Sequence, residues 1–281
     1  MSAQESISIA TLPVMAEAAH QTYPISTLYV VATPIGNVTD ISLRALHLLS
    51  LVNAVACEDT RNTAHLMTRF GLNKPLIAAH QHNEREVAEL LIARLQAGER
   101  IALVSDAGTP AVSDPGARIV DAVRAAGLRV LPLPGASAAI TAISASGLLN
   151  DQFYFVGFLP AKAKQRENML TGLRTVSATM VFYEAPHRIL DCAGALAGVF
   201  EPSRQVVFAR ELTKMFEEIH RCPLSDALAW LAQDAHREKG EFVVLLEGAT
   251  EPADAEEVEA ERILSILLLE WLTSSSFWLV W

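Results

Sequence analysis

The chain has 281 residues, of which 51% are hydrophobic, and a formal net charge of -10. This length and apolar content place it among globular proteins of one large or two modest domains. Its three cysteines, Cys57, Cys192 and Cys222, are far apart and lack metal-ligand spacing, which gives no reason to expect a metal and indicates a reducing, cytoplasmic setting. The acidic balance argues against a polyanionic partner for the surface as a whole, although the charge is unevenly placed.

The first part of the chain alternates predicted strands with predicted helices. Residues 1–26 have neither a basic start nor a continuous apolar core, so we interpret them as a loose extension rather than a signal peptide. Strands are predicted at 27–32, 54–57, 76–79, 101–104 and 128–133. Among the helices between them, one is headed by Asn83, and Glu86 has the spacing of a capping box. This alternation predicts an α/β domain with a largely parallel sheet over residues 27–148.

The second part begins at a predicted boundary within 147–151. Strands are expected at 153–157, 179–183, 205–211, 217–221 and 241–247, and helices at 164–173, 188–199 and 224–234. We therefore predict a second α/β domain over residues 149–249, followed by an atypical tail over 250–281.

Polar loops follow four strands of the first domain, at 33–37, 58–61, 105–110 and 134–137. Because parallel strands point the same way, these loops should meet at one edge of the sheet and form one ligand cleft. The central loop is SDAGTPAVSDPG, which ends where Pro115 can open a helix. Capping of that helix would explain Asp114 but not the rest of the loop. Neither the dinucleotide nor the P-loop fingerprint is present.

Seven segments in chain order carry a resemblance to a known family: TPIGN, EDTR, SDAGTPAVSDPG, LPGASAA, GFLPAK, FYEAPHR and ARELTKMFEE. Over roughly residues 28–248 the chain is identified by them as a member of the tetrapyrrole methylase superfamily, and it is most similar to members that act on ribosomal RNA. The resemblance implies two α/β domains with S-adenosylmethionine in the cleft between them, and a homodimer. It also implies methylation of the ribose 2′-hydroxyl of a cytidine in the decoding region of 16S ribosomal RNA, either naked or in the assembled small subunit.

Carried onto this sequence, the resemblance implies cofactor-binding residues in both domains. They are Asp106, Ala107, Gly108, Thr109, Pro110, Ser137 and Ala138 in the first domain, and Tyr183, Glu211 and Leu212 in the second. A carboxylate such as Asp106 can accept hydrogen bonds from ribose hydroxyls, and loop backbone can read an adenine edge. For Ser137, a local hydrogen bond at the start of a helix is the alternative.

The expected catalytic residues follow the second strand. Asp59 is the first candidate for a general base that takes the 2′-hydroxyl proton, because related methylases place an acid near this position, and Glu58 is the second. Arg61 completes the catalytic set. The alternative is that one of these acids caps the next helix or pairs with Arg61.

The stretch 158–188 is locally basic. Lys162, Lys164, Arg166, His187 and Arg188 are the candidates for contacts with RNA phosphates, and an ordinary solvated surface is the alternative.

The tail departs from the family pattern. Residues 251–281 hold seven acids and one base in place of a basic helical end, and the polar interruptions make a membrane span unexpected. This puts RNA affinity in question. Two other functions therefore stay open: a methylase of a porphyrin-like small molecule, and a cofactor-binding ribosome-assembly module without turnover.

Overall fold

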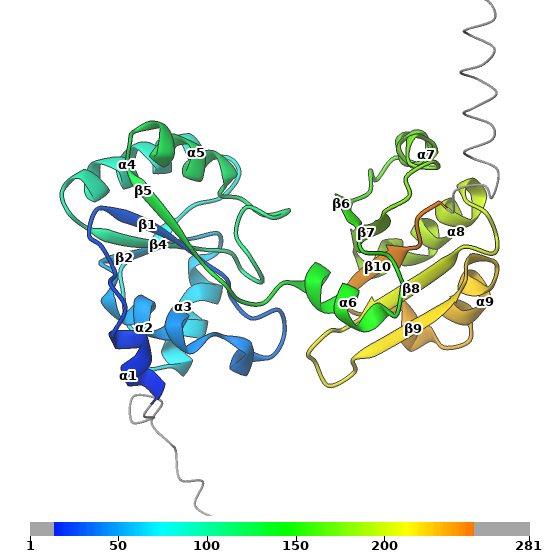
Figure 1. Cartoon of the computed structure of the whole chain (residues 1–281), viewed down its shortest axis with the longest axis horizontal. Helices are drawn as coiled ribbons and strands as arrows, with labels where there is room; N and C mark the ends of the chain where they lie inside the picture. The colour runs from blue at the N-terminus through cyan, green and yellow to red at the C-terminus, as the bar shows by residue number, and fades with distance from the viewer. Residues whose placement is uncertain (1–13, 250–281) are drawn as a thin grey trace, which may run out of the picture.

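The computed structural model describes residues 14–249, which form two α/β domains (Figure 1). The first domain holds a five-stranded sheet in the order β3-β2-β4-β1-β5, in which all neighbours are parallel. Its strands are β1 Thr27–Val31, β2 Ala54–Cys57, β3 Leu76–Ala78, β4 Arg100–Val104 and β5 Arg129–Leu133. The predicted strands of this half and the α/β class are thereby confirmed.

Helices cover both faces of this sheet (Figure 1). One face carries α1 Val14–Ala19, α2 Leu43–Leu51 and α3 Thr60–Arg69, with the short 3-10 turn η2 Val38–Asp40, and the other carries α4 Glu84–Gln96 and α5 Ala117–Ala125. Alternate residues of β1 face opposite layers: Tyr29 packs with the α2 side and Leu28 with the α4 side. Both faces are buried, as expected for a parallel sheet.

Two local expectations differ from the structure. Of the predicted loose extension, residues 14–26 are anchored to the first domain, because Tyr23 and Tyr29 donate hydroxyl hydrogen bonds to the carbonyls of Ala18 and Pro24. Residues 1–13 lie outside the described residues. The capping box expected at Asn83 is not formed, since the Asn83 side chain is used by the preceding turn, where its Oδ1 accepts from the His80 amide at 2.9 Å.

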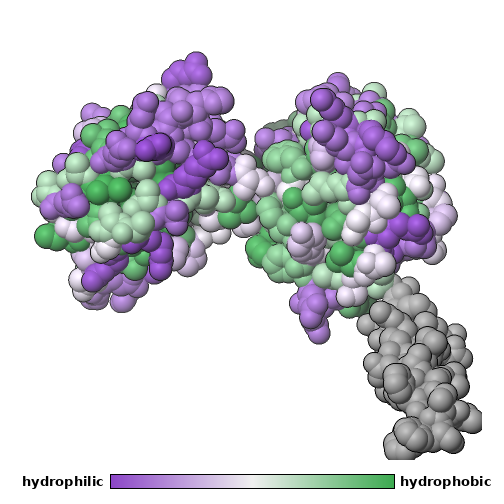
Figure 2. Space-filling view, turned by 90° about the horizontal axis from the view of Figure 1, so that it is seen from above, coloured by the Kyte–Doolittle hydropathy of each residue, from purple (hydrophilic) through white to green (hydrophobic). Residues whose placement is uncertain are grey.

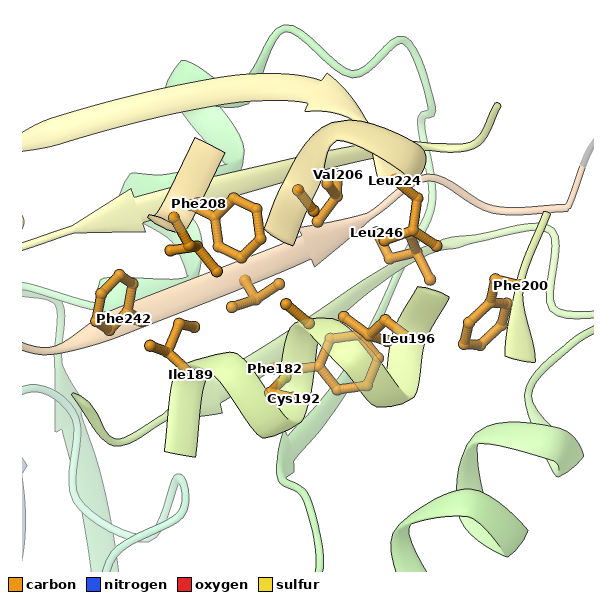
Figure 3. Packing of buried hydrophobic residues seen from close by; sticks show 14 of the residues in the cluster. Phe182, Ile189, Cys192, Leu196, Phe200, Val206, Phe208, Leu224, Phe242 and Leu246 are labelled. Carbon is orange, nitrogen blue, oxygen red and sulfur yellow. The ribbon is translucent and has the colours of Figure 1, made fainter. Parts of the chain in front are cut away.

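The second domain holds a sheet in the order β6-β7-β10-β8-β9, in which only the β6–β7 pair is parallel. Its strands are β6 Phe153–Phe158, β7 Thr179–Glu184, β8 Gln205–Arg210, β9 Glu218–Pro223 and β10 Phe242–Leu246. One face is covered by α7 Ala163–Gly172, α8 Ile189–Val199 and α9 Ala227–Ala232, with the 3-10 turns η3 Pro186–Arg188, η4 Leu224–Asp226 and η5 Ala235–Glu238. Between this sheet and α8, Phe182, Phe208 and Leu196 are fully buried (Figure 3).

Helix α6, Ala138–Ser146, packs on the opposite face of the second sheet. Its Ala139 and Ala142 lie against Val181, Val207 and Leu245. The small alanine side chains let the helix approach the strands closely. By packing, α6 therefore belongs with the second domain, and the chain crosses between the domains at 134–137, earlier than the predicted boundary at 148.

The two domains form separate lobes joined at a narrow waist (Figure 2). Within residues 14–249, no helix combines the length and apolar character needed to cross a bilayer. The tail predicted at 250–281 lies outside the described residues.

Candidate functional site

The site begins at the crevice between β1 and β4. These strands are neighbours, yet the helices that follow them, α2 and α5, lie on opposite faces of the sheet. The loops after β1 and β4 therefore part at this point, which is where open α/β sheets bind ligands. Thr33 and Gly108 join the two loops by reciprocal backbone hydrogen bonds of 2.8 and 3.0 Å.

The loop after β4 has a constrained backbone. Gly108 and Gly116 have φ of 74° and 129°, and Ala111 and Ser113, which carry a Cβ, have φ of 69° and 63°. Left-handed backbone at residues other than glycine costs free energy and is concentrated at functional sites. The expectation that Pro115 opens the next helix is wrong, because α5 begins at Ala117.

Glu84, from the start of α4, anchors the end of this loop. Its Oε1 accepts a hydrogen bond of 2.6 Å from the Gly116 amide. The N-cap position of α5 is held by Gly116 and not by Asp114, which instead lines the cavity described next.

A cavity of about 320 Å³ lies between the domains, with walls from both. Its size is at the lower end of the range for sites of small molecules and cofactors. Of the expected cofactor-binding residues, those that line it are Ala107, Gly108, Thr109, Ser137, Ala138, Tyr183 and Leu212. Ser137 makes no side-chain hydrogen bond to the start of α6, so the alternative proposed for its hydroxyl is not observed.

Three expected cofactor-binding residues do not line this cavity. Pro110 is buried beside it, and Glu211 is held by hydrogen bonds from Lys214 Nζ at 2.8 Å and from the Glu241 amide at 3.0 Å. Asp106 points to a neighbouring groove, where its oxygens accept from the Asp59 amide at 3.1 Å and from Asn62 Nδ2 at 2.8 Å.

The second domain contributes an aromatic wall and a buried acid. The Tyr183 ring meets Phe155 and Phe158 edge to face, with centroids 5.0 and 5.7 Å apart, and burial raises the pKa of its hydroxyl. Next to it lies Glu184, whose side chain is 0% exposed. Its Oε1 is 3.2 Å from Arg188 Nε, whereas its Oε2 has no hydrogen-bond partner among the described residues.

The loop after β1 closes the cavity against the second domain. A Cβ on Gly36 would lie 2.6 Å from Lys214 Cγ and 2.8 Å from Thr213 Oγ1, so only glycine allows this approach. The Asn37 amide also donates to Thr213 Oγ1 at 3.1 Å. This contact holds the loop that carries Leu212 in place.

The expected catalytic acids differ in their surroundings. Asp59 caps α3: its Oδ1 accepts from the Arg61 amide at 2.8 Å, and its Oδ2 lies 2.6 Å from Arg61 Nη2. These hydrogen bonds from Arg61 lower the pKa of the Asp59 carboxyl to about 2. The structure therefore adopts the capping and pairing alternative for Asp59. Partial burial, together with the charges of Asp106 and Asp59, instead raises the pKa of Glu58.

Asp114 was explained in the sequence only as a possible cap of the next helix. It lines the cavity, and burial, with added repulsion from Glu58 and Asp106, raises the pKa of its carboxyl to about 6. The sequence did contain a signal for this residue. The central loop holds two SDxG segments, 105–108 and 113–116, and Asp114 has the same place in the second as Asp106 has in the first.

The expected RNA contacts separate into two groups. Lys162, Lys164 and His187 are exposed, as phosphate binding requires. Arg166 is wrong as a surface contact, because its side chain is 7% exposed and faces Asp191 at 3.5 Å. Arg188 is 20% exposed and is engaged by Glu184 and by the Leu159 carbonyl, so it supports the cavity wall.

This fold and this cavity define a two-domain α/β protein that holds a small ligand between a parallel and a mixed sheet. The chain belongs to the Tetrapyrrole (Corrin/Porphyrin) Methylases, whose family model matches residues 27–228. The membership expected from the seven segments is thus confirmed.

Curated relatives match most of the chain. "Ribosomal RNA small subunit methyltransferase I" of Escherichia coli O157:H7 is 49% identical over 243 residues, which cover 86% of this chain and 84% of the relative. The protein of the same name from Pseudomonas aeruginosa is 50% identical over 246 residues, covering 87% of each chain.

Solved structures share the fold at low identity. The methyltransferase CobJ superposes with a TM-score of 0.60 at 21% identity, covering 79% of this chain and 94% of that one. Uroporphyrin-III C-methyl transferase from Thermus thermophilus, complexed with S-adenyl homocysteine, gives 0.54 at 18% identity and covers 79% and 97%. These likenesses concern the fold alone.

Proposed function

We propose that this chain transfers a methyl group from S-adenosylmethionine to the ribose 2′-hydroxyl of a cytidine in the decoding region of 16S ribosomal RNA. The observation that carries the proposal is about half identity, along nearly the whole length of both chains, to relatives named as small-subunit ribosomal RNA methyltransferases. The inter-domain cavity supplies a place for the cofactor.

The cavity residues fit S-adenosylmethionine. Backbone at Gly108 and small side chains at Ala107 and Ala138 leave room for a flat ring, and the Tyr183 ring offers an apolar wall. Acids in the cavity wall also favour a cofactor whose sulfonium and ammonium are both positive.

When bound, S-adenosylmethionine supplies an electrophilic methyl group. The chain must hold the 2′-oxygen in line with that group and give its proton an acceptor. Asp114 is the better-placed acceptor, since it lines the cavity and its raised pKa of about 6 makes it a stronger base than Asp59. We retain Asp59 and Arg61 in a positioning role at the start of α3, with Glu58 as the second acceptor.

The remaining partner assignments follow from the same proposal. Lys162, Lys164 and His187 are the phosphate contacts on the second domain. The proposed location is the cytoplasm, where the protein would meet small ribosomal subunits. We also propose a homodimer. Large apolar side chains such as Met215 and Phe216 are 90% and 67% exposed, and contact with a second copy of the chain would bury them.

The test is transfer of labelled methyl groups from S-adenosylmethionine to isolated small subunits that lack the modification. Label in the small-subunit RNA, and none in large subunits or in a uroporphyrin-type acceptor, is the expected result. Label in the porphyrin-like acceptor would favour the small-molecule alternative. Cofactor binding without any transfer would favour the assembly module.

A further inference from the structure

A second cavity adjoins the cofactor cavity on the first domain. This α3 groove, of about 350 Å³, lies between the loop that contains Pro34 and Gly36, one face of α3, and the loop that contains Asp106. Ile35 and Ala107 line both the groove and the cofactor cavity. A molecule in the groove therefore lies next to the cofactor.

One face of α3 supplies the polar wall of the groove. Asn62, His65 and Arg69 are spaced three and four residues apart, so they stack on successive turns of the helix, and all three line the groove. The helix sequence TRNTAHLMTR contains no acidic residue. The charges of the helix itself are those of Arg61 and Arg69, and the carboxylates of Asp59 and Asp106 lie at its N-terminal end.

The two basic side chains of the groove are available to a ligand. The other cation of the helix, Arg61, is paired with Asp59 at 2.6 Å. By contrast, Arg69 and His65 are exposed, and no carboxylate of the described chain lies within 4.0 Å of either. An exposed guanidinium beside a concave surface is well suited to a phosphate.

The opposite end of the groove presents a fixed acceptor. The Asp106 carboxylate is held by Asn62 Nδ2 at 2.8 Å and by the Asp59 amide at 3.1 Å. Each carboxylate oxygen can accept a further hydrogen bond, so Asp106 can also accept from a sugar hydroxyl. A ligand that matches both ends carries hydroxyls near the cofactor and a negative charge toward Arg69, which describes a ribonucleotide unit of an RNA strand.

We propose that the α3 groove binds the single-stranded RNA that flanks the methylated nucleotide, with Arg69 and His65 contacting its phosphates. The proposal rests on the proposed function and gives it a substrate path on the first domain, separate from the exposed lysines of the second. It commits to RNA backbone as the occupant, because the charge pattern and the continuity with the cofactor cavity favour it.

The test measures binding of the full-length protein to a small-subunit RNA fragment at several salt concentrations. Arg69→Ala should weaken binding about tenfold and reduce the slope of log affinity against log salt by about 0.7, the value expected for one lost single-strand phosphate contact. His65→Ala should weaken binding in the same direction, and S-adenosylmethionine affinity should not change in either variant.

Arg124→Ala is the matched control. Arg124 is an exposed arginine in the last turn of α5, as Arg69 is in the last turn of α3, but it lies on the opposite face of the sheet. It should leave both affinity and salt slope unchanged, while Arg69→Lys should retain the slope.

Two results would contradict the proposal that the α3 groove binds RNA. If Arg69→Ala, shown to be folded by thermal unfolding, has the RNA affinity and salt slope of the unaltered protein, the groove does not bind the RNA. The proposed function is not affected by that result. If the unaltered protein neither binds nor methylates small-subunit RNA, both proposals fail together.

Discussion

Thr33 and Gly108 exchange two backbone hydrogen bonds, of 2.8 and 3.0 Å, across the point where the loops after β1 and β4 part. Thr33 adds a third link, from its hydroxyl to the Ser105 carbonyl at 3.0 Å. The backbone at Gly108, which lines the inter-domain cavity, is thereby fixed by residues more than 70 positions away in the sequence. Because Gly108 has φ of 74°, this link depends on a residue without a Cβ.

Gly108→Ala should lower the free energy of unfolding by about 1 to 2 kcal/mol, the usual cost of left-handed backbone for a residue with a Cβ. It should also weaken S-adenosylmethionine binding, since Gly108 lines the cavity. Gly71→Ala is the control: φ is 66° and no atom lies within 4 Å of the added carbon, so stability should fall without loss of affinity. Equal cofactor affinity in the two variants would contradict the role given to Gly108 in the cavity. Calorimetric unfolding and titration measure both quantities.

Asp114→Asn tests the proton acceptor. The raised pKa of about 6 means that wild-type turnover should fall as pH drops through 6, when the carboxylate becomes protonated. The variant should lose turnover by about 100-fold or more and lose this acidic limb. Asp121→Asn, an exposed acid on α5, should behave as wild type. Retention of the acidic limb in the Asp114 variant would show that another group takes the proton.

The same carboxyl should affect stability. Its folded pKa of about 6 lies above the ordinary 3.8, so the folded state is favoured below about pH 4 and loses that advantage as pH rises toward 6. At pH 7 Asp114→Asn should therefore be more stable than wild type, by about 1 kcal/mol once solvent screening is allowed for. Urea unfolding at pH 4 and pH 7 measures the difference. A variant less stable than wild type at pH 7 would mean that the ionised carboxylate has a favourable partner.

Asp59→Asn separates the two roles considered for Asp59. Asparagine keeps an oxygen that can cap α3 but loses the ion pair with Arg61, so we expect turnover within about fivefold of wild type, because asparagine caps helices as well as aspartate does. The hypothesis of a general base, drawn from the sequence, predicts instead a loss of about 100-fold or more with cofactor affinity unchanged. Single-turnover kinetics with saturating cofactor decide between them.

Arg188→Ala should act on stability rather than on RNA. Its removal would take from the fully buried Glu184 its nearest cation and leave only Arg166 close by, and breaking a buried pair costs about 3 kcal/mol or more. Burial raises the pKa of Glu184, so the loss should be smaller at low pH, where this carboxyl is protonated. The slope of RNA affinity against salt should not change. A reduced slope in a folded Arg188→Ala protein would restore this residue to the RNA surface.

The sequence predicted well where a local pattern decides the structure. The buried run 54–57 became β2 with unchanged bounds. Seven of the ten cofactor-binding residues expected from the ordered motifs line one cavity.

The sequence failed where long-range packing decides. Arg166 lies in a polar helix, and nothing local shows that it faces Asp191 and the buried Glu184. Likewise α6 follows the first sheet in the chain but packs on the second, because its alanine face fits strands that come later. The α3 groove was missed for the same reason: its three walls come from segments separated by 24 or more positions.

Alkaline hydrolysis of labelled small-subunit RNA tests the central claim most directly. A methyl group on a ribose 2′-oxygen removes the internal nucleophile that alkali needs, so the adjacent phosphodiester bond survives. After incubation with the protein and labelled S-adenosylmethionine, we expect the label in an alkali-resistant dinucleotide whose 5′ residue is cytidine. Label recovered in mononucleotides would place the methyl group on a base and contradict the assignment.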